Sequence, residues 1–110
     1  MTTIFVQDKY AEILATFGDL EESVNLALQR YMIEQISNRI AELRRRTAEY
    51  ETRYGLEYPA FAQRIAEDEA FVHYVESNIN KTWEADLADW EFCHKGIEDW
   101  KKKLENILLA

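Results

Sequence analysis

Proline and glycine are nearly absent from this sequence, since the 110 residues include one Pro and three Gly. All-β sandwiches and barrels need many tight turns, so this scarcity argues against them and favours helices joined by short connections. Cysteine is scarce too, because Cys93 stands alone and cannot form an internal disulfide. No apolar run approaches the roughly 18 residues needed to span a bilayer.

The N-terminus also lacks a targeting signal. Its first ten residues, MTTIFVQDKY, have neither the basic start nor the apolar block of a secretory signal peptide. We therefore expect a cytoplasmic protein that does not associate with membranes.

Basic residues are in the minority, with 13 Lys or Arg against 21 Asp or Glu and a net charge of -8. Residues 1–47 hold six basic and seven acidic residues, whereas residues 48–110 hold seven and 14. A net acidic chain is repelled by phosphate backbones, which argues against a general nucleic-acid binder. The acidic second half can instead meet a basic protein, or it can simply keep the chain soluble.

The chain is organised around the stretch from Asp19 to Tyr54, which contains neither Pro nor Gly and predicts one long helix. Asp19 is a suitable N-cap, and Gly55 can adopt the left-handed conformation that ends a helix. At about 1.5 Å per residue this helix is roughly 54 Å long, so we expect an elongated fold, a dimer or both. Its second half carries the seam of a helix that packs along another: Ile33, Ile36, Ile40, Leu43, Thr47, Tyr50 and Tyr54.

The residues that follow predict further helices. Pro59 suits the first position of a helix, and the apolar pattern up to Ser77 indicates one broken helix or two short ones with a break near Asp68. After a turn at residues 78–80, Asn80 or Thr82 caps a last helix that runs almost to the C-terminus. Its predicted seam, interrupted by Lys101, comprises Trp83, Leu87, Trp90, His94, Ile97, Leu104 and Leu108. We predict an all-α, elongated helical hairpin or bundle with antiparallel long helices.

A short strand is predicted ahead of these helices. Residues Thr2 to Gln7 alternate in the manner of a strand, and no other segment offers a partner, so we expect pairing with the same segment of a second copy. Asp8 then caps a short helix through Phe17, which Gly18 ends.

This order of elements resembles the ribbon-helix-helix unit of small bacterial antitoxins and repressors over residues 1–35. The residues that carry the resemblance are Ile4, Val6, Ile13, Leu14, Phe17, Gly18, Val24, Ala27, Leu28 and Tyr31. The plan of a dimerising unit followed by an acidic helical hairpin at 36–110 also resembles the antitoxin of toxin-antitoxin modules, whose second half covers a basic toxin. The resemblance implies a homodimer held together by Ile4, Val6, Leu14, Phe17, Val24, Leu28 and Tyr31.

The resemblance to the ribbon-helix-helix family supports DNA binding by this chain less well than it supports dimerisation. In that family the outward strand residues read bases and the start of the second helix holds phosphate. Here this helix starts with Asp19, Glu21 and Glu22, whose carboxylates repel DNA. We therefore expect little DNA affinity for the protein alone.

The sequence contains few motifs typical of metal binding or catalysis. Glu91 and His94 have the Glu-x-x-His spacing of di-iron bundles, but a second copy is missing because Ala70 lies three residues before His73. A structural histidine beside a carboxylate is the favoured interpretation, and Cys93 is expected to be a buried, inert thiol. Phosphate-binding loops, nucleophile elbows and Cys-x-x-Cys pairs are missing from the sequence. We predict neither a cofactor, nor a metal, nor an enzyme.

Two basic runs, Arg44-Arg45-Arg46 and Lys101-Lys102-Lys103, fan around their helices. We do not expect them to form one concentrated anion site. We expect them to pair with nearby carboxylates, namely Glu42, Glu49, Glu98 and Glu105.

The last helix carries all three tryptophans. Trp83 and Trp90 share one face while Trp100 does not, so an aromatic is left at an edge for a partner, unless the second half buries all three. We predict a non-catalytic binding partner, foremost an antitoxin-like neutraliser of a basic toxin. A structural dimer or scaffold subunit is the second hypothesis, and a metal-dependent helical enzyme the third. Candidate partner-binding residues are Trp83, Glu84, Asp86, Asp89, Trp90, Glu91, Phe92, Asp99 and Trp100.

Overall fold

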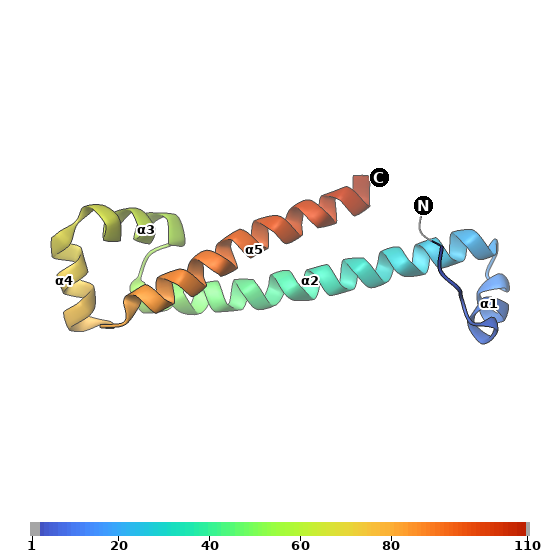
Figure 1. The fold of residues 1–110 in the computed structure, drawn as a ribbon, viewed down its shortest axis with the longest axis horizontal. Coiled ribbons are helices and arrows are strands. Elements are labelled where there is room, and N and C mark those ends of the chain that lie inside the picture. Colours follow the sequence, from blue (N-terminus) through green and yellow to red (C-terminus); the bar gives the residue numbers. More distant parts are fainter. Residues whose placement is uncertain (1–2, 110) are drawn as a thin grey trace. The chain divides into compact units, whose positions relative to one another are not determined.

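The computed structural model describes residues 3–109, and the helices there are, in chain order, α1 (Asp8–Ala15), α2 (Leu20–Tyr54), α3 (Tyr58–Glu67), α4 (Glu69–Asn78) and α5 (Trp83–Leu109). They belong to two units, unit 1 (Met1–Gln35) and unit 2 (Ile36–Ala110), which share the continuous helix α2 (Figure 1). The predicted all-α class is confirmed.

Helix α2 begins and ends as the sequence predicts. The backbone N–H of Glu22 donates to Asp19 Oδ2 at 3.0 Å. At the other end Gly55 has φ of 75°, a left-handed conformation that side chains with a Cβ disfavour. Its N–H donates to the carbonyl of Glu51 at 2.7 Å, which closes the last turn of the helix.

The break between α3 and α4 also lies where the sequence places it. Asp68 has an extended backbone, and its Oδ1 accepts the N–H of Phe71 at 3.1 Å. The same residue therefore ends α3 and caps α4. After α4, Asn80 Oδ1 accepts the backbone N–H of Thr82 at 2.9 Å and its hydroxyl at 2.8 Å, so the turn before α5 is fixed by one side chain.

Unit 2 is built on two hydrophobic clusters. Helices α2 and α5 run antiparallel and side by side, with α3 and α4 at one end of the pair (Figure 1). The cluster at that end contains Tyr54, Phe61, Ile65, Phe71, Val75 and Trp90. The cluster farther along the α2 and α5 pair contains Ile36, Ile40, Leu43, Cys93 and Ile97. The seam predicted for α2 is thus the face that packs.

The seam predicted for α5 is wrong at His94 and Leu108, whereas Ile97 and Leu104 pack as predicted. Cys93 is buried in place of the half-buried His94, and Leu108 is 57% exposed while Ile107 packs against the core. Cys93, Trp100 and Ile107, which pack in this cluster, each lie one position before His94, Lys101 and Leu108 of the predicted pattern. The physical reason is a change of neighbours, because Trp90 packs in the cluster with α3 and α4, whereas Cys93 packs against α2.

Unit 1 contains α1 and the first part of α2, and none of residues 3–35 is buried. Residues 3–7 form no strand in the single chain, while Thr2 lies outside the described residues. The N-cap of α1 is Gln7 rather than Asp8, and α1 ends at Ala15 rather than Phe17. The N–H groups of Thr16 and Phe17 bond to carbonyls three residues earlier, at 3.1 Å each, so these two residues form a tighter turn.

Candidate protein-binding surfaces

The surface of unit 1 is unusually apolar. Of the 15 large hydrophobic side chains that are exposed among residues 3–109, 11 lie in this unit, including Phe5 at 99% and Phe17 at 77% exposure. A hollow of about 430 Å³ on the same unit is lined by Leu14, Phe17, Ser23, Leu26, Ala27 and Arg30. A segment this short rarely builds a core by itself. Unit 1 therefore has enough apolar side chains to form a core, but in the single chain these side chains remain exposed.

The residues implied in dimerisation all contribute to this accessible surface. Leu14 and Val24 are half-buried. The others are exposed: Ile4, Val6, Phe17, Leu28 and Tyr31. The sequence interpretation missed Phe5, Leu26 and Met32, which are exposed as well. Their signal was available, because Leu26 and Met32 widen the apolar face of α2 beyond a narrow seam.

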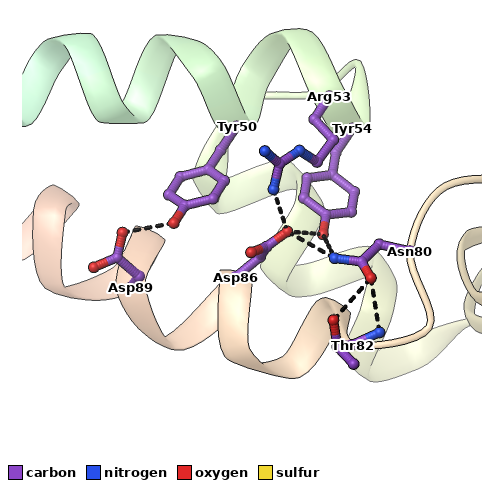
Figure 2. A network of polar contacts seen from close by, with 7 residues as sticks. All are labelled: Tyr50, Arg53, Tyr54, Asn80, Thr82, Asp86 and Asp89. Atoms are coloured by element: carbon purple, nitrogen blue, oxygen red, sulfur yellow. Dashed lines mark hydrogen bonds and ion pairs between the residues drawn. The ribbon is translucent and has the colours of Figure 1, made fainter.

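Two of the candidate partner-binding carboxylates on α5 instead bind α2. Asp86 Oδ2 accepts hydrogen bonds from Tyr54 Oη, from Arg53 at 2.6 Å and from Asn80 at 3.0 Å (Figure 2). One helical turn farther on, Asp89 accepts the hydroxyl of Tyr50 at 2.6 Å and pairs with Arg46. These carboxylates join the two long helices of unit 2.

The network shifts the pKa values of its members. Burial raises the pKa of Asp86, but the hydrogen bonds from Tyr54, Arg53 and Asn80 outweigh it, so this pKa lies below its usual value. The pKa of Tyr50 is raised strongly, first by burial and then by its hydrogen bond to Asp89. Both shifts favour the charge states that the network needs, a carboxylate that accepts and a phenol that donates.

Trp90 belongs to the core of unit 2. It has no exposed surface, and its ring lies 5.3 to 5.9 Å from the ring centroids of Tyr50, Tyr54, Tyr58 and Phe61. Its indole N–H is buried and has no hydrogen-bond partner in the described chain. Because Trp90 has no exposed surface, it is not part of an accessible surface.

The other aromatic candidates on α5 remain accessible to different degrees. Phe92 is 62% exposed. Trp100 is half-buried, with Lys103 Nζ 4.2 Å from its ring centroid. Both line a groove of about 460 Å³ between α2 and α5, together with Asp99. The structure therefore brings Phe92, Asp99 and Trp100 together.

The remaining candidates lie apart from this groove. Trp83 is half-buried, and its indole N–H donates to Glu76 at 3.2 Å. Glu84 is exposed, and Glu91 pairs with Lys95 at 2.7 Å. Exposed Glu67 and Glu69, which the sequence interpretation did not select, flank the capping residue Asp68. Their local signal was three consecutive carboxylates at a helix break.

His94 and Cys93, the residues considered for metal binding or catalysis, pack against other side chains. His94 stacks on Tyr58 with ring centroids 4.7 Å apart. Cys93 is fully buried, as expected, and burial raises the pKa of its thiol, with the negative charge of Asp89 adding to the effect. Within residues 3–109, no three His, Cys, Asp or Glu side chains are grouped so that they could hold a metal ion.

Comparisons of the chain with protein-family models, with curated proteins and with solved structures found no match. None of the helices in the described part of the chain has the length and apolar character required to cross a bilayer. The surfaces of the two units are therefore the features that bear on function.

Proposed function

We propose that this protein is a non-catalytic, cytoplasmic binding protein, foremost an antitoxin-like neutraliser of a basic protein toxin, and that it forms a homodimer through unit 1. The observation that carries the proposal is the surface of unit 1, where no described residue is buried and 11 large hydrophobic side chains are exposed. Covering such a surface releases about 25 cal/mol for each Å² of apolar area removed from water.

The ribbon of the proposed dimer uses residues 3–7. Ile4 and Val6 are exposed and lie two positions apart, so both can face one side of a strand. Pairing this strand with its copy would satisfy backbone groups that a single chain leaves to water. The apolar faces of α1 and of the first part of α2 would then pack beneath it.

A basic partner would meet unit 2 on its acidic part. Residues 48–94 contain 11 Asp or Glu against three Lys or Arg. Trp90 is buried, and Asp86 and Asp89 are bonded to side chains of α2. We therefore assign the contact to exposed groups, with Phe92 as the anchor and Glu84 as a steering charge. Exposed carboxylates raise the rate of association with a basic protein, while a large aromatic contributes binding energy.

The dimer is tested by sedimentation equilibrium of the full chain at about 0.5 M salt, where contacts between exposed charges are screened. The double variant Phe17→Glu, Leu28→Glu places charges on the apolar surface of unit 1 and should be a monomer where the wild type is a dimer. Tyr74→Glu, at an exposed aromatic of unit 2, is the matched control and should leave the dimer intact. A monomeric wild type, or a dimeric double variant, at this high salt concentration would contradict the proposal.

The partner is tested with the product of the adjacent gene, measured by calorimetry. A small basic protein should bind, and raising the salt from about 0.1 M to 0.5 M should weaken binding. Phe92→Ala should cost about 2 kcal/mol of binding free energy without lowering the melting temperature. A structural dimer or scaffold subunit, the alternative function, would share the unit 1 contact but bind no such partner.

A further inference from the structure

Charge is divided unevenly within unit 2. Residues 36–47 of α2 hold four Arg and one Glu, and residues 95–103 of α5 hold four Lys against two acidic residues. The packing of Ile36, Ile40 and Leu43 against Cys93 and Ile97 brings these two segments side by side. We call the pair of segments the basic belt. The belt lies away from the acidic end of unit 2, where α3 and α4 pack.

The belt contains a hollow of about 380 Å³, lined by Ser37, Ile40, Ala41, Arg44, Lys101 and Leu104. Two cations from facing helices and one hydroxyl group line it, and the lining includes no carboxylate. Like charges brought together repel each other, and an anion placed between them removes this repulsion. The composition of the hollow therefore fits a carboxylate beside an apolar surface.

Ion pairs within the chain leave this hollow largely unneutralised. Arg45 pairs with Glu49 at 2.8 Å, and Arg46 pairs with Asp89. Arg44 has no ion pair with any residue that the structure describes, and Lys101 reaches Glu98 only at 3.6 Å. The pairing expected from the sequence thus holds for Glu49 and Glu98, while Glu42 and Glu105 make no ion pair among residues 3–109.

We propose that this hollow binds a carboxylate-bearing segment of a second copy, namely the corner between α3 and α4 that presents Glu67 and Glu69. Both carboxylates are exposed, and neither takes part in an ion pair within the described residues. Asp68 between them is used in capping α4. The net charge of -8 argues against a nucleic acid as the occupant, whereas it supplies carboxylates on every copy.

Two copies can satisfy this contact reciprocally. The belt and the corner lie toward opposite ends of the α2 and α5 pair, so an antiparallel arrangement of two such units places each corner at the belt of the other. Taken alone, a two-fold contact of this kind joins two copies and then closes. The contact uses unit 2 alone and is independent of the proposed interface in unit 1.

The test uses the full chain carrying Phe17→Glu and Leu28→Glu, which removes the contact proposed for unit 1. Sedimentation velocity should detect a dimer at about 0.05 M salt that dissociates at about 0.5 M salt. Adding Arg44→Glu and Lys101→Glu should raise the dissociation constant by at least about tenfold. The matched control, Arg45→Glu with Lys102→Glu, makes the same change of charge outside the hollow and should have a smaller effect.

Exchange of charge identifies the occupant. Glu67→Lys with Glu69→Lys should weaken the dimer to a similar extent. Mixing this variant with Arg44→Glu, Lys101→Glu should restore the dimer, because both contacts then pair opposite charges. Failure of the mixture to associate, or equal effects of the hollow variant and its control, would overturn the proposal. So would a DNA duplex that binds wild type at about 0.15 M salt but not the hollow variant, because the belt would then be a phosphate site.

Discussion

Leu43 of α2 packs directly over Gly96 of α5, where a Cβ added to the glycine would lie 2.9 Å from Leu43 Cδ1. Glycine in the interior of a helix costs about 1 kcal/mol relative to alanine. Alanine at this position would stabilise α5 through its higher helix propensity, but its Cβ would clash with Leu43.

Gly96→Ala should therefore behave differently in two backgrounds. In the wild type, the gain in helix propensity is offset because Leu43 must move. In a Leu43→Val background, which removes the Cδ atoms, Gly96→Ala should stabilise the fold by about 1 kcal/mol. Urea denaturation of the four proteins measures the coupling, and an equal effect in both backgrounds would show that the contact does not limit residue 96.

Asp86 should contribute stability that is lost in acid. Its pKa lies below the usual value, because hydrogen bonds from Tyr54, Arg53 and Asn80 outweigh the effect of burial. A depressed pKa gives stability that is present above the unfolded pKa of about 3.9 and disappears as the pH falls through the folded value. Asp86→Asn should thus cost about 1 to 2 kcal/mol at neutral pH and progressively less as the pH falls below the unfolded value.

The measurement is the free energy of unfolding in urea between neutral pH and acid. Glu84→Gln, at an exposed carboxylate of the same helix, is the control and should follow the wild type. If Asp86→Asn costs the same at every pH, Asp86 has no depressed pKa in the folded protein.

Tyr50 should contribute stability that is lost in alkali. Burial and the hydrogen bond to Asp89 raise its pKa, so its stabilising effect is complete below the unfolded value of about 10 and disappears as the pH rises toward the folded value. Tyr50→Phe should cost about 1 kcal/mol at neutral pH and flatten the alkaline loss of stability. Tyr74→Phe, at an exposed tyrosine, is the control, and the absorbance of tyrosinate follows the titration. A titration of Tyr50 near pH 10 would contradict the prediction.

Substitutions at the buried Trp90 and at the exposed Phe92 should differ in their effect on the free energy of unfolding. Trp90→Ala should cost about 3 to 5 kcal/mol, because it opens a cavity among four aromatic rings. Trp90→Phe should cost less, since it keeps a ring and removes the buried N–H that lacks a partner. Phe92→Ala should change the free energy of unfolding by about 0.5 kcal/mol or less, because the side chain is mostly exposed. Thermal unfolding followed by circular dichroism ranks the three variants, and any other order would contradict the assignment.

The sequence predicts the features of this fold that depend on a few neighbouring residues. Asp19 and Gly55 bound α2, and Asp68 separates α3 from α4, because capping is a contact between residues within one helical turn. The seam of α2 was predictable for a similar reason, since one helix, α5, covers most of its length in unit 2.

The features that the sequence did not predict depend on distant residues. The packed residues of α5 depart from the predicted seam at Cys93, because α3 and α4 cover one part of this helix and α2 covers the next. The role of Asp86 depends on Tyr54, which lies 32 positions away in the chain. Periodicity along one helix contains no information on either contact. The expected strand at residues 2–7 depends on a second chain and stays a prediction.

The hydrogen bonds that join the side chains of α2 to those of α5 in the described structure all originate from one end of α2, at Arg46, Tyr50, Arg53 and Tyr54. Among residues 3–109, α5 is held toward its C-terminus by apolar contacts of Ile97, Trp100, Leu104 and Ile107. Local opening should therefore begin at the last turns of α5, and amide hydrogens near Leu104 should exchange with solvent sooner than those near Trp90. Since Lys101 and Leu104 line the hollow of the basic belt, any molecule that binds there must also pay the entropy of ordering these turns.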